Sequence, residues 1–137
     1  MNKNFQRALA IALLAMAFGP VHAADVAVKL TGAQEVPAIM TDAQGSGTIT
    51  IGNDMAVSGS ITTTGIMGTV AHIHMAEMGK NGPVIIALTK TSDNVWSVPA
   101  GSKLTDEQYA AFKAGNLYVN VHSDAHKPGE IRAQLKP

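Results

Sequence analysis

The sequence predicts an all-β protein, an antiparallel, Greek-key-like β-sandwich of about eight short strands with one short helix near residues 105–114. Two observations carry this prediction. Short segments alternate apolar and polar residues, as half-buried strands do, and Gly, Asn and Asp recur between them as turn residues. Only one stretch has helical character, whereas a parallel α/β sheet would need a helix after most of its strands.

The strands can be placed in order along the chain. Residues 26–30 alternate apolar and polar side chains, and residues 47–51 and 56–64 do the same on either side of a Gly-Asn-Asp hairpin turn. After Pro83 comes an almost wholly apolar run, residues 84–88, which predicts a strand buried on both faces. The other expected strands are residues 70–75, 94–98, 117–122 and 131–135.

The single helix has clear start and stop signals. Thr105 and Gln108 have the spacing of a capping box, in which each side chain bonds the backbone of the other residue. Tyr109 and Phe112 are three residues apart, so they share the face that packs inward. Gly115 supplies the stop.

The N-terminal segment predicts export. Lys3 and Arg7 precede the apolar run 8–18. Val21 and Ala23 then provide small side chains at the two positions that a signal peptidase reads. This run is shorter than the roughly 20 residues of a membrane-spanning helix. We therefore expect a signal peptide over residues 1–23 and one mature domain over residues 24–137, with no membrane span after cleavage. The short signal favours the bacterial periplasm, with a secreted form as the alternative.

Composition excludes several functions. The whole sequence carries ten basic and ten acidic side chains, and loss of Lys3 and Arg7 with the signal leaves a net charge of −2. A weakly acidic domain with scattered lysines lacks the basic surface that nucleic acids require. The chain has no cysteine, which excludes disulfides, thiolate ligands and thiol catalysis. Any metal site must therefore use His, Met or carboxylate groups.

The histidines suggest such a site. All four that follow residue 23 fall in two short stretches. Side chains two apart on a strand point to the same face, so His72 and His74 stand side by side. In the second stretch His122 shares a face with Tyr118 and Asn120, whereas His126 lies in the turn that follows. If the two strands are neighbours, three or four imidazoles converge.

The metal predicted for this site is copper, with zinc as the alternative. Methionines bracket the first histidine pair, and thioethers together with imidazoles favour copper, Cu(I) above all. We take His72, His74 and His122 as the expected ligands, with His126 and Met75 as further candidates. The competing hypothesis is a non-catalytic adhesion or interaction module, whose histidines make structural hydrogen bonds and lie apart.

Five blocks of residues resemble the CHRD (chordin-type) domain family, in the family's order and over essentially the whole mature domain. They are residues 30–37, 71–74, 81–84, 115–122 and 128–132. The chain departs from the family pattern at Ala133, where the family usually has Gly, and His126 is not part of that pattern. The resemblance implies a β-sandwich domain of exported bacterial proteins, without a settled activity. Within the blocks, we expect Glu35 and Glu130 to hold loop backbone through hydrogen bonds or to pair with Arg132.

A second resemblance concerns the histidines alone. The His72-x-His74 step and the later Val121-His122 pair look like the copper half of the Cu/Zn superoxide dismutases. That resemblance implies a copper enzyme with Arg132 beside the open position of the metal. The cysteines and zinc-loop histidines of that family have no counterpart here, so we assign no catalytic residue. Three hypotheses therefore stand in order. The first is metal binding for storage, delivery or protection, the second is the interaction module, and the third is dismutase activity.

The export prediction has a direct test. Protein recovered from the periplasm or the medium should begin at Ala24, or within a residue or two of it, because signal peptidase removes the segment before that point. Intact-mass analysis measures the difference. An exported fraction that retains residues 1–18 would contradict the signal peptide.

Overall fold

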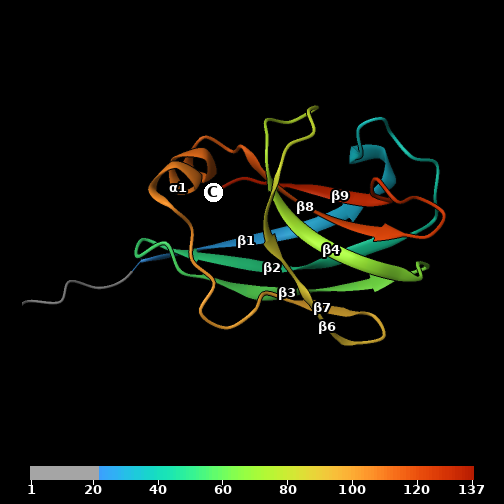
Figure 1. Cartoon of the computed structure of the whole chain (residues 1–137), viewed down its shortest axis with the longest axis horizontal. Coiled ribbons are helices and arrows are strands. Elements are labelled where there is room, and N and C mark those ends of the chain that lie inside the picture. The colour runs from blue at the N-terminus through green and yellow to red at the C-terminus, as the bar shows by residue number, and fades with distance from the viewer. Residues whose placement is uncertain (1–21) are drawn as a thin grey trace, which may run out of the picture.

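The computed structural model describes residues 22–137 (Figure 1). The predicted signal peptide, except for its last two residues, lies outside them. Among the described residues, no helix has both the length and the apolar character needed to cross a membrane.

Nine strands and one α-helix make up the described chain. The first half contains β1 (Ala23–Thr31), the short 3-10 helix η1 (Gly32–Gln34), β2 (Gln44–Gly52), β3 (Val57–Thr64) and β4 (Gly68–Met75). The second half contains β5 (Val84–Ala87), β6 (Thr89–Ser92), β7 (Val95–Ser97), α1 (Asp106–Lys113), β8 (Leu117–Ser123) and β9 (Ile131–Leu135). The all-β prediction with one short helix is confirmed, and the observed helix falls within the predicted range.

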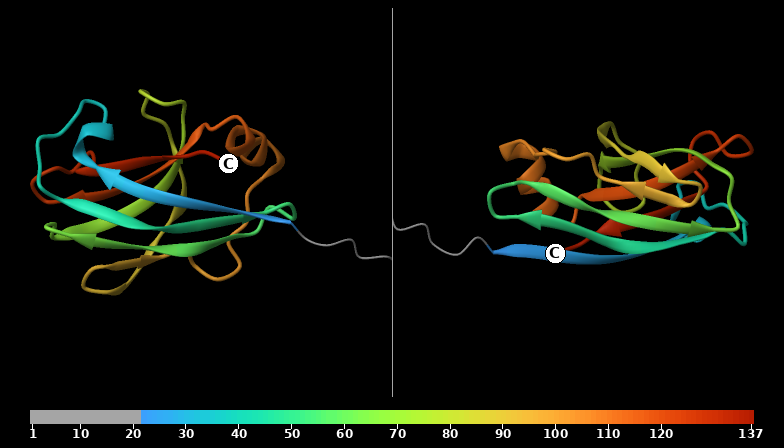
Figure 2. Two further views of the ribbon diagram at one scale, coloured as in Figure 1. Left: turned by 180° about the vertical axis from the view of Figure 1, so that it is seen from behind. Right: turned by 90° about the horizontal axis from the view of Figure 1, so that it is seen from below.

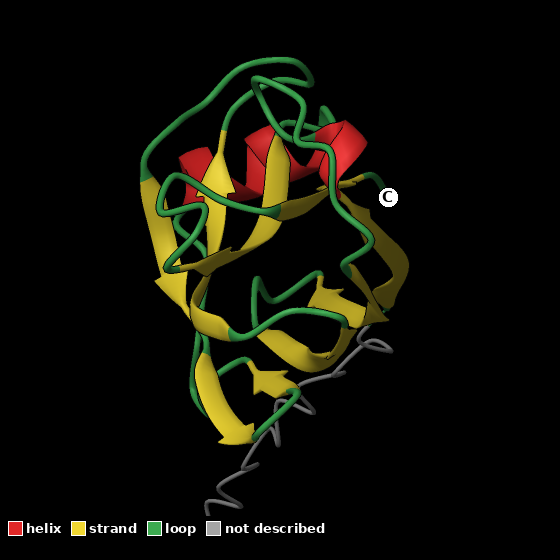
Figure 3. Cartoon of the chain, turned by 90° about the vertical axis from the view of Figure 1, so that its right-hand side faces the viewer, coloured by secondary structure: helices red, strands yellow, loops and turns green. Residues whose placement is uncertain are grey.

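All nine strands belong to one antiparallel sheet in the order β5-β4-β8-β9-β1-β2-β3-β7-β6. Its two end strands, β5 and β6, are consecutive in the chain and separated only by Leu88. The Leu88 N–H donates to the Ala71 carbonyl of β4 at 2.9 Å, which draws the two ends of the sheet together. The sheet therefore nearly closes, and the end-on view in Figure 3 shows its strands around a common interior.

The core fills the space between the two halves of this sheet, which Figure 2 shows from two further sides. Inward-facing aliphatic residues from nearly every strand are buried, together with Trp96 and Phe112. The halves approach closely at Gly68, where an added Cβ atom would lie 2.8 Å from the Trp96 ring and 3.1 Å from Val121. Glycine is required there because a larger side chain would push β7 and β8 apart.

Two local predictions differ from the structure. The apolar run after Pro83 is not buried on both faces, because β5 lies at the end of the strand order and Val84 remains 50% exposed. In contrast, every residue of β8 is buried, including the polar face that carries Asn120 and His122. Loops cover this second face, which sequence alternation alone does not reveal.

Helix α1 has the predicted caps. The Gln108 N–H donates to Thr105 Oγ1 at 3.2 Å, and the Thr105 N–H donates to Gln108 Oε1 at 3.0 Å. At the other end Gly115 has a φ of 77°, and its N–H donates to the Phe112 carbonyl at 2.8 Å. These bonds satisfy backbone groups that have no partner within the helix.

The N-cap makes a measurable contribution. Thr105→Ala should lower the free energy of unfolding by about 1 kcal/mol, because the Gln108 N–H loses its acceptor. Urea denaturation measures this loss, and Thr105→Ser serves as a control that keeps the hydroxyl. Metal affinity should not change, since the helix lies outside the histidine cluster. A Thr105→Ala protein as stable as the parent would contradict the capping role.

Candidate metal centre

Strand register brings the two predicted histidine stretches together. Strands β4 and β8 are antiparallel neighbours in which His72 is opposite Asn120 and Val70 is opposite His122. Since paired residues point to the same face of a sheet, His72, His74 and His122 all project from the outer side. Figure 1 shows β4, β8 and β9 side by side beneath the loops that cover this side.

The three imidazoles converge. One ring nitrogen from each of His72, His74 and His122 lies within 4.8 Å of the others. His72 Nδ1 is 3.1 Å from His122 Nε2. His74 and His122 are 7% and 8% exposed, whereas His72 is partly exposed. The cluster is therefore accessible to solvent mainly at His72.

Backbone carbonyls orient the two buried rings. His74 Nδ1–H donates to the Gly82 carbonyl at 3.0 Å, and His122 Nδ1–H donates to the Lys127 carbonyl at 2.6 Å. Because a neutral imidazole has one N–H, we assign the proton to Nδ1 in both rings, which leaves both Nε2 lone pairs free. This is how metal-binding histidines are commonly oriented by a second hydrogen bond.

The free Nε2 atoms meet at a third side chain. Asn120 Oδ1 lies 2.9 Å from His74 Nε2 and 3.0 Å from His122 Nε2. Asn120 Nδ2 donates to Glu35 Oε1 at 3.4 Å. Asn120 and Glu35 are both buried, so a carboxyl group lies directly behind the amide.

A stack of planar groups borders the cluster. The His74 and Tyr118 rings are parallel at 4.6 Å, and the Arg132 guanidinium lies 3.4 Å from the Tyr118 ring centre. Arg132 is 2% exposed and donates to the Lys80 carbonyl at 2.8 Å and to Asn81 Oδ1 at 3.2 Å. The Tyr118 ring therefore contacts both His74 and Arg132, and Arg132 is paired with Asn120 between β9 and β8. The guanidinium thus supports the covering loop.

The loops are tied to each other and to the sheet. Asn81 Nδ2 donates to the Val36 carbonyl at 2.7 Å, and the Gly82 N–H donates to the Tyr118 hydroxyl at 3.2 Å. Gly129 packs against the Glu35–Asn120 pair, where an added Cβ atom would be 2.6 Å from Asn120 Nδ2. A side chain at Gly129 would therefore disrupt the support behind the cluster.

The acidic residues of the family blocks accept hydrogen bonds from side chains. Glu35 accepts from Asn120, and Glu130 Oε1 accepts from Thr41 Oγ1 at 2.7 Å. Within residues 22–137 the one ion pair joins Lys80 to Glu77, at 3.4 Å, so neither Glu35 nor Glu130 forms an ion pair with Arg132. Both carboxyl groups therefore act through hydrogen bonds.

Burial sets the protonation of the cluster. Desolvation lowers the pKa of His72 and of His74 below 6.5, and the neighbouring imidazoles lower that of His72 further. Desolvation also raises the pKa of Glu35 above 4.5, against the opposing effects of Asn120 and Arg132. Low imidazole pKa values favour the neutral form, which is the form that binds metals.

Two of the predicted ligands lie elsewhere. Met75 follows His74 on β4 and packs against the hydrophobic core, on the other face of the strand. His126 is on the turn after β8, outside the group of converging ring nitrogens, and its backbone N–H donates to Ser123 Oγ at 3.1 Å. The structure adds Asn120 to the cluster. The sequence signal for Asn120 is its position two residues before His122 on one strand, which places both side chains on the same face.

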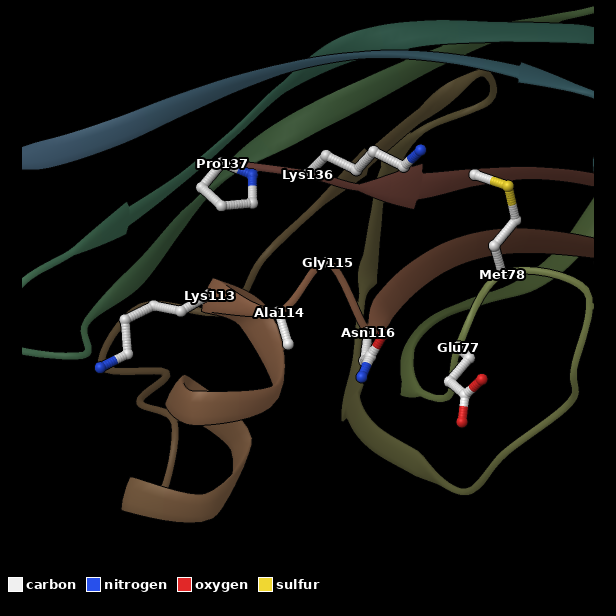
Figure 4. A pocket seen from close by; sticks show the side chains of 8 residues that line it. All are labelled: Glu77, Met78, Lys113, Ala114, Gly115, Asn116, Lys136 and Pro137. Atoms are coloured by element: carbon white, nitrogen blue, oxygen red, sulfur yellow. The ribbon is translucent and has the colours of Figure 1, made fainter.

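An open hollow elsewhere on the surface has different chemistry. It measures about 700 Å³ and lies between the end of α1 and the last residues of the chain. Figure 4 shows its Lys113 and Lys136 side chains pointing in opposite directions. Lys113 Nζ lies 4.9 Å from the Tyr109 ring centre instead. The charged groups do not converge, and none of the three histidines lines this hollow.

Comparison with known proteins identifies the family. Residues 26–135 match the CHRD domain, so this chain belongs to the CHRD domain family. Comparisons with curated proteins and with solved structures gave no match. All five blocks that carry the family resemblance contribute to the histidine cluster or to the loops around it.

The pKa shifts predict how the stability of the metal-free protein depends on pH. The folded-state pKa of both His72 and His74 lies below 6.5, so the unfolded chain binds more protons as the pH falls. Their stabilising contribution is present above pH 6.5 and is lost as the pH decreases through the folded-state pKa values. Glu35 acts in the opposite sense: its contribution is present below pH 4.5 and is lost as the pH rises through its raised pKa.

Urea midpoints measured in a metal chelator between pH 7.5 and 5 test this prediction. Comparing the parent with His72→Gln removes the contribution of Glu35, which both proteins share. The parent should lose more stability than the variant over this range. Equal losses would show that burial does not disfavour the charged form of His72.

Proposed function

We propose that this CHRD domain is an exported metal-binding protein that holds copper through His72, His74 and His122. The observation that carries the proposal is the convergence of three ring nitrogens within 4.8 Å, two of them on rings whose Nδ1–H is already bonded to a carbonyl. Two Nε2 lone pairs are thereby directed toward the point where the third imidazole nitrogen lies, an arrangement that a metal ion can bind.

The distances suit a transition-metal ion. Two bonds of about 2.0–2.1 Å from imidazole nitrogens to one ion span at most about 4.2 Å. The 3.1 Å separation of His72 Nδ1 and His122 Nε2 already lies within that limit. The widest pair, within 4.8 Å, needs ring shifts of less than about 1 Å.

The ligand chemistry favours copper over zinc, although by a different argument from the one based on methionine. Met75 packs on the opposite face of β4, so the protein ligands in this cluster are imidazoles. Divalent copper has the higher affinity for a given nitrogen site in the Irving–Williams order. We therefore favour Cu(II), with Zn(II) as the alternative.

Storage, delivery or protection fits the surroundings better than catalysis. Two of the three imidazoles are nearly buried, and ion access is confined to the side of His72. Arg132, the residue that would attract an anionic substrate to an open metal position, is buried behind Tyr118. A protein that retains and releases the ion needs no substrate position.

The interaction module remains the second candidate, since one observation favours it. In both His74 and His122, Nδ1–H donates to a backbone carbonyl and Nε2 contacts the Asn120 amide. Both ring nitrogens therefore have a polar neighbour without any metal. In that case the cluster would rigidify the loops for contact with a protein partner.

Metal titration of single variants decides between the two candidates. His72→Ala, His74→Ala and His122→Ala should each lower Cu(II) affinity about 100-fold or more, because losing even an outer partner of a ligand costs about 10–100-fold. His126→Ala is the matched control and should bind nearly as the parent does. Isothermal titration calorimetry with Cu(II) and Zn(II), each buffered by a weak chelator, measures the affinities.

Two further readouts support the titration. Copper affinity should fall below about pH 6, because protonated imidazole cannot bind a metal. Copper at 100 times its dissociation constant should stabilise the parent by about 2.7 kcal/mol and raise its melting temperature. If the parent and all three histidine variants respond alike, the metal site does not exist and the interaction module replaces it.

A further inference from the structure

Asn120 occupies a position that its hydrogen bonds alone do not explain. Its Oδ1 faces His74 Nε2 at 2.9 Å and His122 Nε2 at 3.0 Å. Each ring carries its proton on Nδ1, where a carbonyl accepts it. Both Nε2 atoms are therefore acceptors, and so is Oδ1. The lone pairs of His74 Nε2 and Asn120 Oδ1 therefore face each other with no proton between them, while His122 Nε2 also lies 3.1 Å from His72 Nδ1.

A second proton on either ring would place a positive charge in a buried position, since His74 and His122 are 7% and 8% exposed, and burying an unpaired charge is costly. An ion bound between the three acceptors would resolve the conflict between these lone pairs, because a cation attracts all three at once.

Glu35 and Gly129 set the orientation of the Asn120 amide. Asn120 Nδ2 donates to Glu35 Oε1 at 3.4 Å, and Gly129 packs against both groups. Rotating the amide would place Oδ1 against the carboxyl oxygen and move the same conflict to Glu35, unless that carboxyl were protonated. With Glu35 Oε1 as the acceptor for Nδ2–H, Oδ1 is directed at the histidines.

We propose that Asn120 Oδ1 is the fourth ligand of the metal site, with Glu35 as the residue that orients it. The inference rests on the metal-binding function proposed above. Four ligands at about 2.0–2.1 Å from one ion are separated from their neighbours by about 2.9–3.4 Å, depending on the geometry. The separations of 2.9, 3.0 and 3.1 Å among Oδ1 and the ring nitrogens match such edges.

An N₃O ligand set has consequences for selectivity. An amide oxygen is a neutral, hard ligand, which favours Cu(II) and Zn(II) over the soft Cu(I) ion. The site therefore binds the oxidised form of copper more tightly, and reduction weakens the complex.

Copper titration and electron paramagnetic resonance of Asn120 variants test the inference. Asn120→Asp keeps an oxygen in place and should bind Cu(II) at least as tightly as the parent. Asn120→Leu fills the same space without an oxygen and should bind at least about 10-fold more weakly, with altered g and hyperfine values along the Cu(II) axis. Thr63→Val is the matched control: it removes a buried hydroxyl from β3, outside the cluster, and should leave the spectrum unchanged.

A measurement on the unaltered protein covers the case in which Asn120→Leu does not fold. Zn(II) binding should shift the side-chain ¹³Cγ resonance of Asn120 and leave that of Asn116 unchanged. The competing arrangement is an amide rotated to donate to both Nε2 atoms beside a protonated Glu35. In that arrangement Oδ1 faces away from the ion, and Glu35→Gln should then strengthen binding or leave it unaltered.

The outcomes separate the two proposals. If the parent binds neither copper nor zinc, the proposed function fails. If the parent binds but Asn120→Leu keeps the affinity and the spectrum of the parent, only the role of Asn120 fails. An unshifted Asn120 ¹³Cγ resonance in the zinc-bound parent would likewise overturn the inference.

Discussion

The structure depends on one constraint, the burial of polar side chains on the outer face of β4, β8 and β9. Ordinarily this face of an antiparallel sheet meets water, but here His74, Asn120 and Arg132 are all shielded from it. A buried polar group without a partner costs about 1–3 kcal/mol, so each of these must find its hydrogen bonds within the protein. The partners come from loops: the carbonyls of Lys80 and Gly82 and the carboxyl group of Glu35.

This constraint explains why the family blocks are distant in sequence and close in space. The block at 30–37 supplies Glu35 behind Asn120, and the block at 81–84 supplies the carbonyl that orients His74. The block at 128–132 supplies Gly129, whose missing side chain makes room for the amide. Each block is thus one side of a polar cluster that no single segment could complete.

Much of the fold could be predicted from the sequence, and less of the site. Alternation placed the strands of β1, β2 and β3, and the Thr105–Gln108 spacing placed the helix cap, because these features depend on local residues. The sequence does not determine the pairing of β4 with β8, which joins His72 and His74 to His122, because the register between distant strands depends on the whole sheet. Loops that bury the outer face, and hence the role of Asn120, have no local pattern. Met75 lies next to His74 in sequence but packs against the core on the other face of β4, because neighbouring strand residues alternate between faces.

The position of β9 also affects when the protein can fold. Strand β9 lies between β8 and β1, so the last strand of the chain joins the first strand to the half of the sheet that carries the histidines. A chain that is synthesised from its N-terminus cannot join β8 to β1 through β9 until residues 131–135 are available. Native structure must then form late and over long sequence separations, which slows folding. Such a delay keeps the two halves of the sheet apart until synthesis of the chain is nearly complete.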